Sequence, residues 1–124
     1  MDLYAENILH HYKNPIGKIE DETKFDCCHR ELNPSCGDEI TACIKFDDDK
    51  INIGWKGTGC AVSQSAISML CEIWQENPPT EDDLLKFSKE DMLEILNVPV
   101  SNKRMKCALL GMNAVKNALQ NKNN

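Results

Sequence analysis

The chain has 124 residues, 41% of them hydrophobic, and a formal net charge of −6. This length suits one compact core better than two, so we expect a single domain over residues 1–124. The acidic balance argues against nucleic-acid binding, which normally requires a basic surface. No apolar run reaches the roughly 20 residues of a membrane helix, and the N-terminal segment is acidic where a signal peptide is basic, so we expect a cytoplasmic protein without membrane contacts.

The first half of the chain predicts a helix followed by strands. Residues 2–13 are typical of a short helix that ends at Asn14-Pro15. Its residues available for packing are Leu3, Ile8, Leu9 and Tyr12. Residues 18–35 have mixed polarity and are interpreted as a loop that leads into a first strand. Apolar residues then alternate over 40–46 and again over 51–55, with an acidic turn between them, which indicates a β-hairpin.

The second half of the chain predicts helices. Residues 59–74 have the periodicity of an amphipathic helix. Its apolar stripe contains Val62, Ala66, Met69, Leu70 and Ile73. Its polar stripe contains Gln64, Ser68, Glu72 and Gln75. Two short acidic helices follow, with N-terminal caps predicted from the pairs Thr80 with Asp83 and Ser88 with Asp91. A last helix carries Cys107, Gly111, Val115 and Ala118 on its apolar face, and strands followed by helices indicate an α+β fold.

Seven cysteines are unexpected in such a chain, because a reducing cytosol does not sustain a disulfide framework. We therefore expect core residues, metal ligands or reactive thiols. No CxxC pair occurs, so any metal site has to be assembled from distant segments. Cys43 and Cys71 fit buried core positions, whereas Cys27 and Cys28 are less clearly structural.

The three histidines are interpreted as surface or helix-end residues rather than as ligands. They are His10, His11 and His29.

Cys36, Cys60 and Cys107 each fall at the end of a predicted element: a bend, a strand-to-helix junction and the start of the last helix. The N-terminus of a helix favours a thiolate over a thiol. Neighbouring cations add to this effect at the third cysteine, so a lowered thiol pKa is expected there. These cations are Lys103, Arg104 and Lys106.

Asp38 adds an oxygen ligand two residues after Cys36. Three thiolates and one carboxylate complete a tetrahedral zinc site, and they also suffice to hold a small iron-sulfur cluster. A carboxylate binds a soft cluster less well than a fourth thiolate, so it makes release of the cluster easier. The pattern alone is compatible with one shared site and with separate structural cysteines.

Four motifs, in this order, resemble the U-type iron-sulfur cluster assembly scaffolds, the family of IscU, SufU and the N-terminal domain of NifU. The motifs are YKNP with Gly17, NPSCGD, GCA and RMKCALL. Successive cysteines in the last three motifs are separated by 23 and 46 residues. The resemblance covers almost the whole chain.

The resemblance implies a small antiparallel sheet with helices packed on one face and the ligands at one end. It also implies a scaffold rather than an enzyme, which accepts sulfur from a cysteine desulfurase, assembles a transient [2Fe-2S] cluster and passes it to apo-proteins. Cys36, Cys60 and Cys107 are implied as ligands and sulfur acceptors, and Asp38 as the labilising fourth ligand. Zinc often occupies the same site in this family.

The alternative is a zinc-dependent sulfur acceptor, a sulfurtransferase partner of a desulfurase. Lys106 stands where IscU-like members have histidine, and SufU-like members also have lysine there. The 46-residue spacing, in contrast, is close to the IscU pattern.

An Hsp70-type chaperone is a further implied partner, although residues 98–103 keep only part of the LPPVK-type motif. A permanent structural zinc module is disfavoured, because such sites rarely use a carboxylate together with an exposed, cation-flanked thiol.

Overall fold

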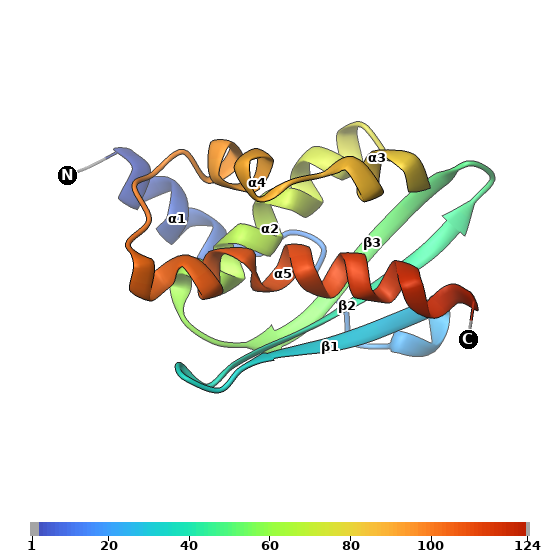
Figure 1. Ribbon diagram of the computed structural model, residues 1–124, viewed down its shortest axis with the longest axis horizontal. Helices are drawn as coiled ribbons and strands as arrows, with labels where there is room; N and C mark the ends of the chain where they lie inside the picture. The colour runs from blue at the N-terminus through green and yellow to red at the C-terminus, as the bar shows by residue number, and fades with distance from the viewer. Residues whose placement is uncertain (1–2, 124) are drawn as a thin grey trace.

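The computed structural model describes residues 3–123 and contains one antiparallel sheet with helices on one of its faces (Figure 1). The elements, in order, are α1 (Leu3–Lys13), the 3-10 helix η1 (Glu22–Lys24), β1 (Cys27–Asn33), β2 (Asp38–Asp47), β3 (Lys50–Thr58), α2 (Ala61–Glu76), α3 (Glu81–Lys86), α4 (Lys89–Leu96), α5 (Asn102–Gln120) and the 3-10 helix η2 (Asn121–Asn123). The α+β class expected from the sequence is confirmed. Residue 2 and the side chain of Leu3, both assigned to the first helix, lie outside the described part of the chain.

The sheet has the strand order β1-β2-β3, with β2 in the centre. β1 pairs with β2 from Cys27 opposite Ile44 to Asn33 opposite Asp38, and β2 pairs with β3 through a tight hairpin. The alternation predicted for 40–46 is confirmed, because Ile40, Ala42 and Ile44 are all 0% exposed. The segment 18–35, interpreted only as a loop entering a strand, contains η1 and the whole of β1.

The core lies between the sheet and two long helices. α5 crosses β1 and β2, α2 packs against β3 and α5, and α1 packs on α2 (Figure 1). Apolar side chains of the sheet, α2, α4 and α5 form one buried cluster, and their removal from water is the main stabilising contribution. The largest fully buried side chains include Trp55, Ile67, Leu70, Met92 and Val115.

The side chains of α1 that are buried against α2 are not the ones predicted from the sequence. Leu9 and Tyr12 are each 42% exposed, whereas His11 is only 3% exposed. His11 Nδ1 lies 2.8 Å from the Oγ atom of Ser68, a residue that the pattern assigned to the polar face of α2. Ser68 Oγ also accepts a hydrogen bond from the backbone N–H of Ile16 at 2.8 Å. His11 lies in the last turn of α1, as expected for a helix-end residue, but it is buried, and Ser68 is buried instead of facing solvent. Their mutual hydrogen bond allows both polar groups to be buried between α1 and α2.

The predicted caps of the short helices are confirmed. Thr80 with Asp83 and Ser88 with Asp91 form reciprocal capping boxes at α3 and α4. None of the helices in the described part of the chain is both long and apolar enough to cross a membrane.

Cys28 and Cys43 form a disulfide between β1 and β2, so the expectation that the cysteines remain unpaired was wrong. The two residues lie directly opposite each other in the strand register, with their Cα atoms 4.1 Å apart. This proximity depends on strand pairing, which the sequence pattern for 18–35 did not reveal. Cys71 is 1% exposed in α2, as expected for a core cysteine, and its burial raises its pKa to about 12.

Candidate metal centre

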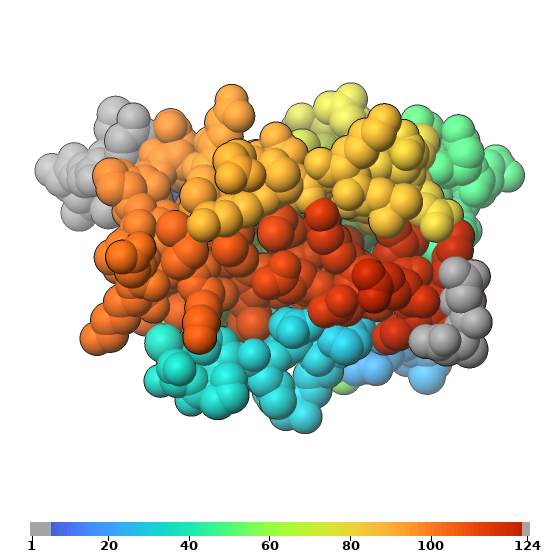
Figure 2. Space-filling view, in the orientation of Figure 1, coloured from blue at the N-terminus to red at the C-terminus, as the bar shows by residue number. Residues whose placement is uncertain are grey.

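Three segments that are distant in sequence meet at one end of the sheet: the β1–β2 turn, the start of α2 and the first turns of α5 (Figure 1). The space-filling view shows the turn lying beside the start of α5 (Figure 2). A hollow of about 540 Å³ separates these two segments on the outside, lined by residues such as Leu32, Pro34 and Lys106. The motifs that contain Cys36, Cys60 and Cys107 therefore converge.

The β1–β2 turn positions Cys36. Asn33 and Asp38 are the last paired residues of the hairpin, and the backbone N–H of Cys36 donates to the carbonyl oxygen of Asn33 at 3.2 Å. Gly37 has a φ of 70°, a left-handed conformation that glycine adopts without a steric penalty. Cys36 is therefore half-buried on a bend, as predicted.

Asp38 is the first residue of β2 and is only 2% exposed. Its Oδ1 atom accepts a hydrogen bond from the backbone N–H of Cys60 at 2.9 Å, and its Oδ2 atom lies 3.8 Å from Cys60 Sγ. Gly59 makes this approach feasible, because a Cβ atom there would lie 2.7 Å from Asp38 Oδ1. The carboxylate thus joins the hairpin to Cys60, the N-cap residue of α2.

Cys107 reaches the same place from α5 and is 0% exposed. One ligand atom from each of Cys36, Asp38 and Cys107 lies within 4.8 Å of the other two. Asn33 Nδ2 donates a hydrogen bond to Cys107 Sγ at 3.5 Å. The structure therefore brings all four sequence-predicted site residues together, with Cys60 joined through Asp38.

The pKa of the Cys107 thiol is raised, whereas a lowered pKa was expected from the sequence. α5 begins at Asn102, so Cys107 lies in its second turn, beyond the first-turn N–H groups that stabilise a thiolate. Burial, followed by hydrogen bonds with Asp38, Cys36 and Cys60, raises its pKa. In the metal-free protein this residue is therefore a thiol near pH 7, and a metal that binds it must displace a proton.

Two residues near the sulfurs were not singled out as functional from the sequence. Asn33 appeared only as part of a motif, and its place at the end of a strand was the available signal. Arg104 appeared as one of three nearby cations and as the first residue of a motif. A hydrogen bond to Cys107, together with the charges of Cys60 and Cys36, raises the pKa of the Arg104 guanidinium. Both side chains stabilise negative charge on sulfur.

The other four cysteines and two of the histidines make other contacts. Cys27 is half-buried and packs against the core. Cys71 is in the core, Cys28 and Cys43 are bonded to each other, His11 contacts Ser68, and His29 lies 3.0 Å from Glu31 Oε2. The donor set at the sheet end is therefore three sulfurs and one carboxylate. Its chemistry fits a thiophilic ion such as zinc or iron.

Comparisons with known proteins agree with the resemblance seen in the motifs. The family described as NifU-like N terminal domain matches residues 3–123. An Archaeoglobus fulgidus protein named iron-sulfur cluster assembly scaffold protein IscU 1 is 31% identical over 120 residues, which cover 94% of this chain and 74% of the relative. A Bacillus subtilis protein named zinc-dependent sulfurtransferase SufU is 36% identical over 73 residues, which cover 56% of this chain and 47% of the relative.

A solved structure from Fervidobacterium islandicum, described as a candidate iron-sulfur cluster assembly scaffold protein for the SUF system, superposes with a TM-score of 0.69. It is 28% identical in sequence, and the match covers 92% of this chain and 94% of that one. The family match spans nearly the whole chain and agrees with these relatives, which confirms the interpretation of the motifs. The chain belongs to the NifU-like N-terminal domain family.

Proposed function

We propose that this chain is an iron-sulfur cluster assembly scaffold, which accepts sulfur from a cysteine desulfurase, assembles a transient [2Fe-2S] cluster and passes it to apo-proteins. The observation that carries the proposal is the convergence of Cys36, Asp38, Cys60 and Cys107 from three elements. Three sulfurs and one oxygen suit iron or zinc, and they lie at one end of the molecule, where partner proteins can approach. Several relatives are named iron-sulfur cluster assembly scaffold proteins.

The three cysteines are assigned as ligands and sulfur acceptors, and Asp38 as the ligand that shortens the lifetime of the cluster. Asp38 Oδ1 is occupied by the Cys60 N–H, so Oδ2 is the oxygen available to a metal. A single hard oxygen forms the weakest of the four bonds to a soft cluster. A recipient thiol can therefore replace it first.

Anaerobic reconstitution with ferrous iron, L-cysteine and a cysteine desulfurase tests this function. The expected result is visible absorption of a [2Fe-2S] chromophore that disappears as an apo-ferredoxin acquires its own cluster. Metal analysis of the protein before and after reconstitution shows whether iron has replaced zinc. Retention of zinc with no chromophore, under conditions that load a known scaffold, would contradict the proposal.

A second candidate function is that of a zinc-dependent sulfur acceptor. Lys106 in place of histidine and the similarity to a protein named zinc-dependent sulfurtransferase favour it. This function predicts that the zinc-loaded protein accelerates turnover of the desulfurase and that chelation of zinc abolishes the effect. A scaffold instead builds clusters after zinc has been replaced by iron.

A further inference from the structure

Cys28 and Cys43 lie on the sheet face opposite to the helices. Neighbours of Cys43 in β2, Ala42 and Ile44, point into the core, so Cys43 itself points to the other face. Ile19 and Phe25 pack on this face at Gly54, and Cys43 is 0% exposed although it does not belong to the main buried cluster. Close packing is evident at Gly54, opposite Cys43 in β3, where a Cβ atom would lie 2.6 Å from Ile19 Cγ2.

The disulfide has a specific position relative to the candidate metal centre. It closes a loop with a sequence separation of 15, which consists of the paired parts of β1 and β2 and the turn between them. The tip of this loop carries Cys36 and Asp38, two of the four proposed ligands. The register runs without a break from Cys28 opposite Cys43 to Asn33 opposite Asp38. The sulfur bridge therefore holds the base of the hairpin that presents the site.

We propose that Cys28 and Cys43 are a reversible redox site whose substrates are small-molecule disulfides, and that its oxidation slows metal loss from the centre at the hairpin tip. In the first step the Cys28 thiolate attacks the small disulfide, which gives a mixed disulfide and releases one thiolate. Cys43 then attacks the Cys28 sulfur and releases the second thiolate. The two cysteine thiols lose two protons and two electrons in total, and one small disulfide is reduced to two thiols.

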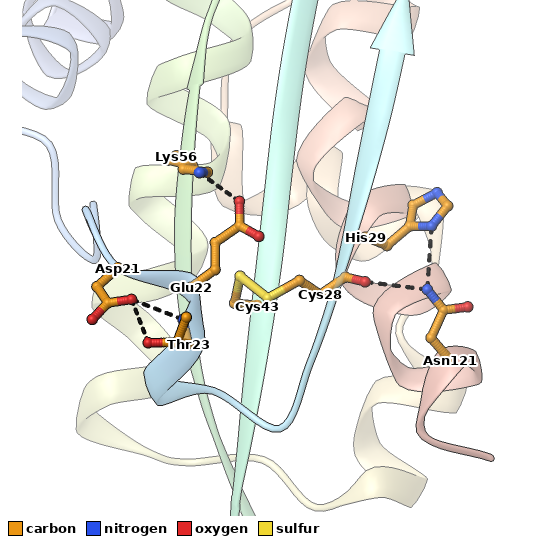
Figure 3. The surroundings of a disulfide bond; sticks show 8 residues. All are labelled: Asp21, Glu22, Thr23, Cys28, His29, Cys43, Lys56 and Asn121. Carbon is orange, nitrogen blue, oxygen red and sulfur yellow. Dashed lines mark hydrogen bonds and ion pairs between the residues drawn. A yellow bond between two sulfur atoms is a disulfide. The ribbon is translucent and has the colours of Figure 1, made fainter. Parts of the chain in front are cut away.

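The surroundings of the pair explain this order of attack. Cys28 is half-buried and therefore more accessible to the small disulfide than the fully buried Cys43. The Glu22 carboxylate lies within 4.8 Å of both sulfurs and is paired with Lys56 Nζ at 2.5 Å (Figure 3). At this separation one bridging water suffices to carry a thiol proton to the carboxylate. Direct opposition of the two strand positions makes closure of the bridge intramolecular, with no rearrangement of the sheet.

The effect on the metal follows from the geometry of the hairpin and rests on the proposed function. Loss of a metal requires at least one ligand to move, and Cys36 and Asp38 move most easily when β1 separates from β2. A covalent bond between the strands restricts this local opening. Reduction removes the restriction without altering any proposed ligand.

Equilibration of the zinc-loaded protein in buffers of glutathione and glutathione disulfide tests both parts of the proposal. Bound zinc protects the thiols at the hairpin tip. Acid quenching, alkylation and mass analysis of proteolytic fragments then identify the oxidised cysteines. The expected result is a bridge between Cys28 and Cys43. Zinc release to a coloured chelator should be about tenfold slower in the oxidised protein, which corresponds to about 1.4 kcal/mol.

Two variants serve as controls. The double variant Cys28→Ala/Cys43→Ala should release zinc at one rate under oxidising and reducing conditions. Cys71→Ala, which removes a buried cysteine of the helix layer, should keep the wild-type difference.

Any different result would overturn part of the proposal. Absence of the 28–43 bridge across all buffers would overturn the redox site, and equal release rates in both redox states would overturn the link to the metal. A second zinc equivalent in the reduced protein, lost in the double variant, would show that Glu22, Cys28 and Cys43 bind metal instead of acting as a redox site. Failure of the protein to bind zinc at all would overturn the link to the metal, whereas fragment mapping would still decide the redox site and reconstitution with iron would decide the proposed function.

Discussion

The Asp38 carboxylate accepts a hydrogen bond from the backbone N–H of Cys60 at 2.9 Å, although 22 residues separate the two. Asp38 is buried at the start of β2, and Cys60 caps the N-terminus of α2. A buried backbone N–H without a partner is costly, so this contact stabilises the fold as well as the geometry of the sulfur atoms. Asp38 therefore has a structural role in addition to the role proposed for it as a ligand.

Two substitutions of Asp38 separate these roles. Asp38→Ala leaves the Cys60 N–H unpaired and should lower the free energy of unfolding of the metal-free protein by about 1–3 kcal/mol. Asp38→Asn keeps an oxygen acceptor and should remain close to the wild type in stability, whereas both variants should bind zinc more weakly. Urea unfolding and zinc competition with a chelator measure the two effects. Equal stability of Asp38→Ala and the wild type would show that the hydrogen bond contributes nothing.

Asn33 donates to Cys107 Sγ at 3.5 Å through its side chain, while its backbone oxygen closes the turn at Cys36. Asn33→Ala removes only the first of these contacts. Hydrogen bonds to ligand atoms typically change metal affinity 10- to 100-fold, so we expect zinc affinity to fall by about tenfold. Ser35→Ala, an exposed change in the same turn, is the matched control. Equal affinities for the two variants would exclude a role for the Asn33 amide.

His11 makes the stability of the protein depend on pH. Burial lowers the pKa of His11, the charge of Glu72 partly raises it, and the neighbouring His10 lowers it again. The unfolded chain binds this proton at a higher pH than the folded protein, so the stabilising contribution is complete above about pH 6.5 and is lost as the pH falls through the lowered value. The wild type should therefore lose stability as the pH falls below about 6.5.

Urea unfolding of His11→Gln over the same pH range provides the control. Glutamine does not titrate, so the variant should show a shallower dependence on pH, whatever its stability near neutral pH. Parallel slopes for the two proteins would mean that other groups account for the loss.

The sequence predicted most of the fold because local signals decided it. Alternation placed Ile40, Ala42 and Ile44 on one face of a strand, and capping pairs marked the starts of α3 and α4. Failures occurred where a distant partner overrode the local pattern. His11 and Ser68 are buried because they bond to each other, and this pairing of α1 with α2 is invisible to periodicity.

At the candidate site, too, local sequence signals predicted some features and missed those that depend on distant contacts. Motifs identified Cys36, Asp38, Cys60 and Cys107, and the fold brings them together. The pKa of Cys107 was predicted in the wrong direction, because burial under the hairpin depends on how α5 crosses the sheet and not on neighbours in sequence. The Cys28–Cys43 bridge was missed for a related reason, since only the register of β1 against β2 places these residues opposite each other.

Serine substitutions of the cysteines separate metal binding from stability. Cys36→Ser and Cys60→Ser change half-buried residues at the hairpin tip and at the start of α2. Each should reduce zinc affinity by more than the roughly 10- to 100-fold expected for a change outside the ligand set. Because both side chains retain access to solvent, the metal-free variants should unfold at nearly the wild-type urea concentration.

Cys71→Ser should affect the stability of the protein but not its metal binding. Cys71 is 1% exposed in α2, and a buried hydroxyl without a partner should lower the free energy of unfolding by about 1–3 kcal/mol. The ratio of zinc bound per folded chain should nevertheless stay at the wild-type value. Cys107→Ser should show both losses, because Cys107 is 0% exposed and is also one of the proposed ligands.

Zinc stoichiometry by metal analysis and urea unfolding of the metal-free protein together distinguish the four variants. Unimpaired zinc affinity in Cys36→Ser, Cys60→Ser or Cys107→Ser would remove that cysteine from the proposed ligand set. Loss of zinc by folded Cys71→Ser would show that the metal depends on the packing of α2 against the sheet. In that case the three cysteines at the sheet end could no longer be assigned from metal loss alone, and the cluster absorption of each variant after reconstitution would have to decide between ligand and structural support.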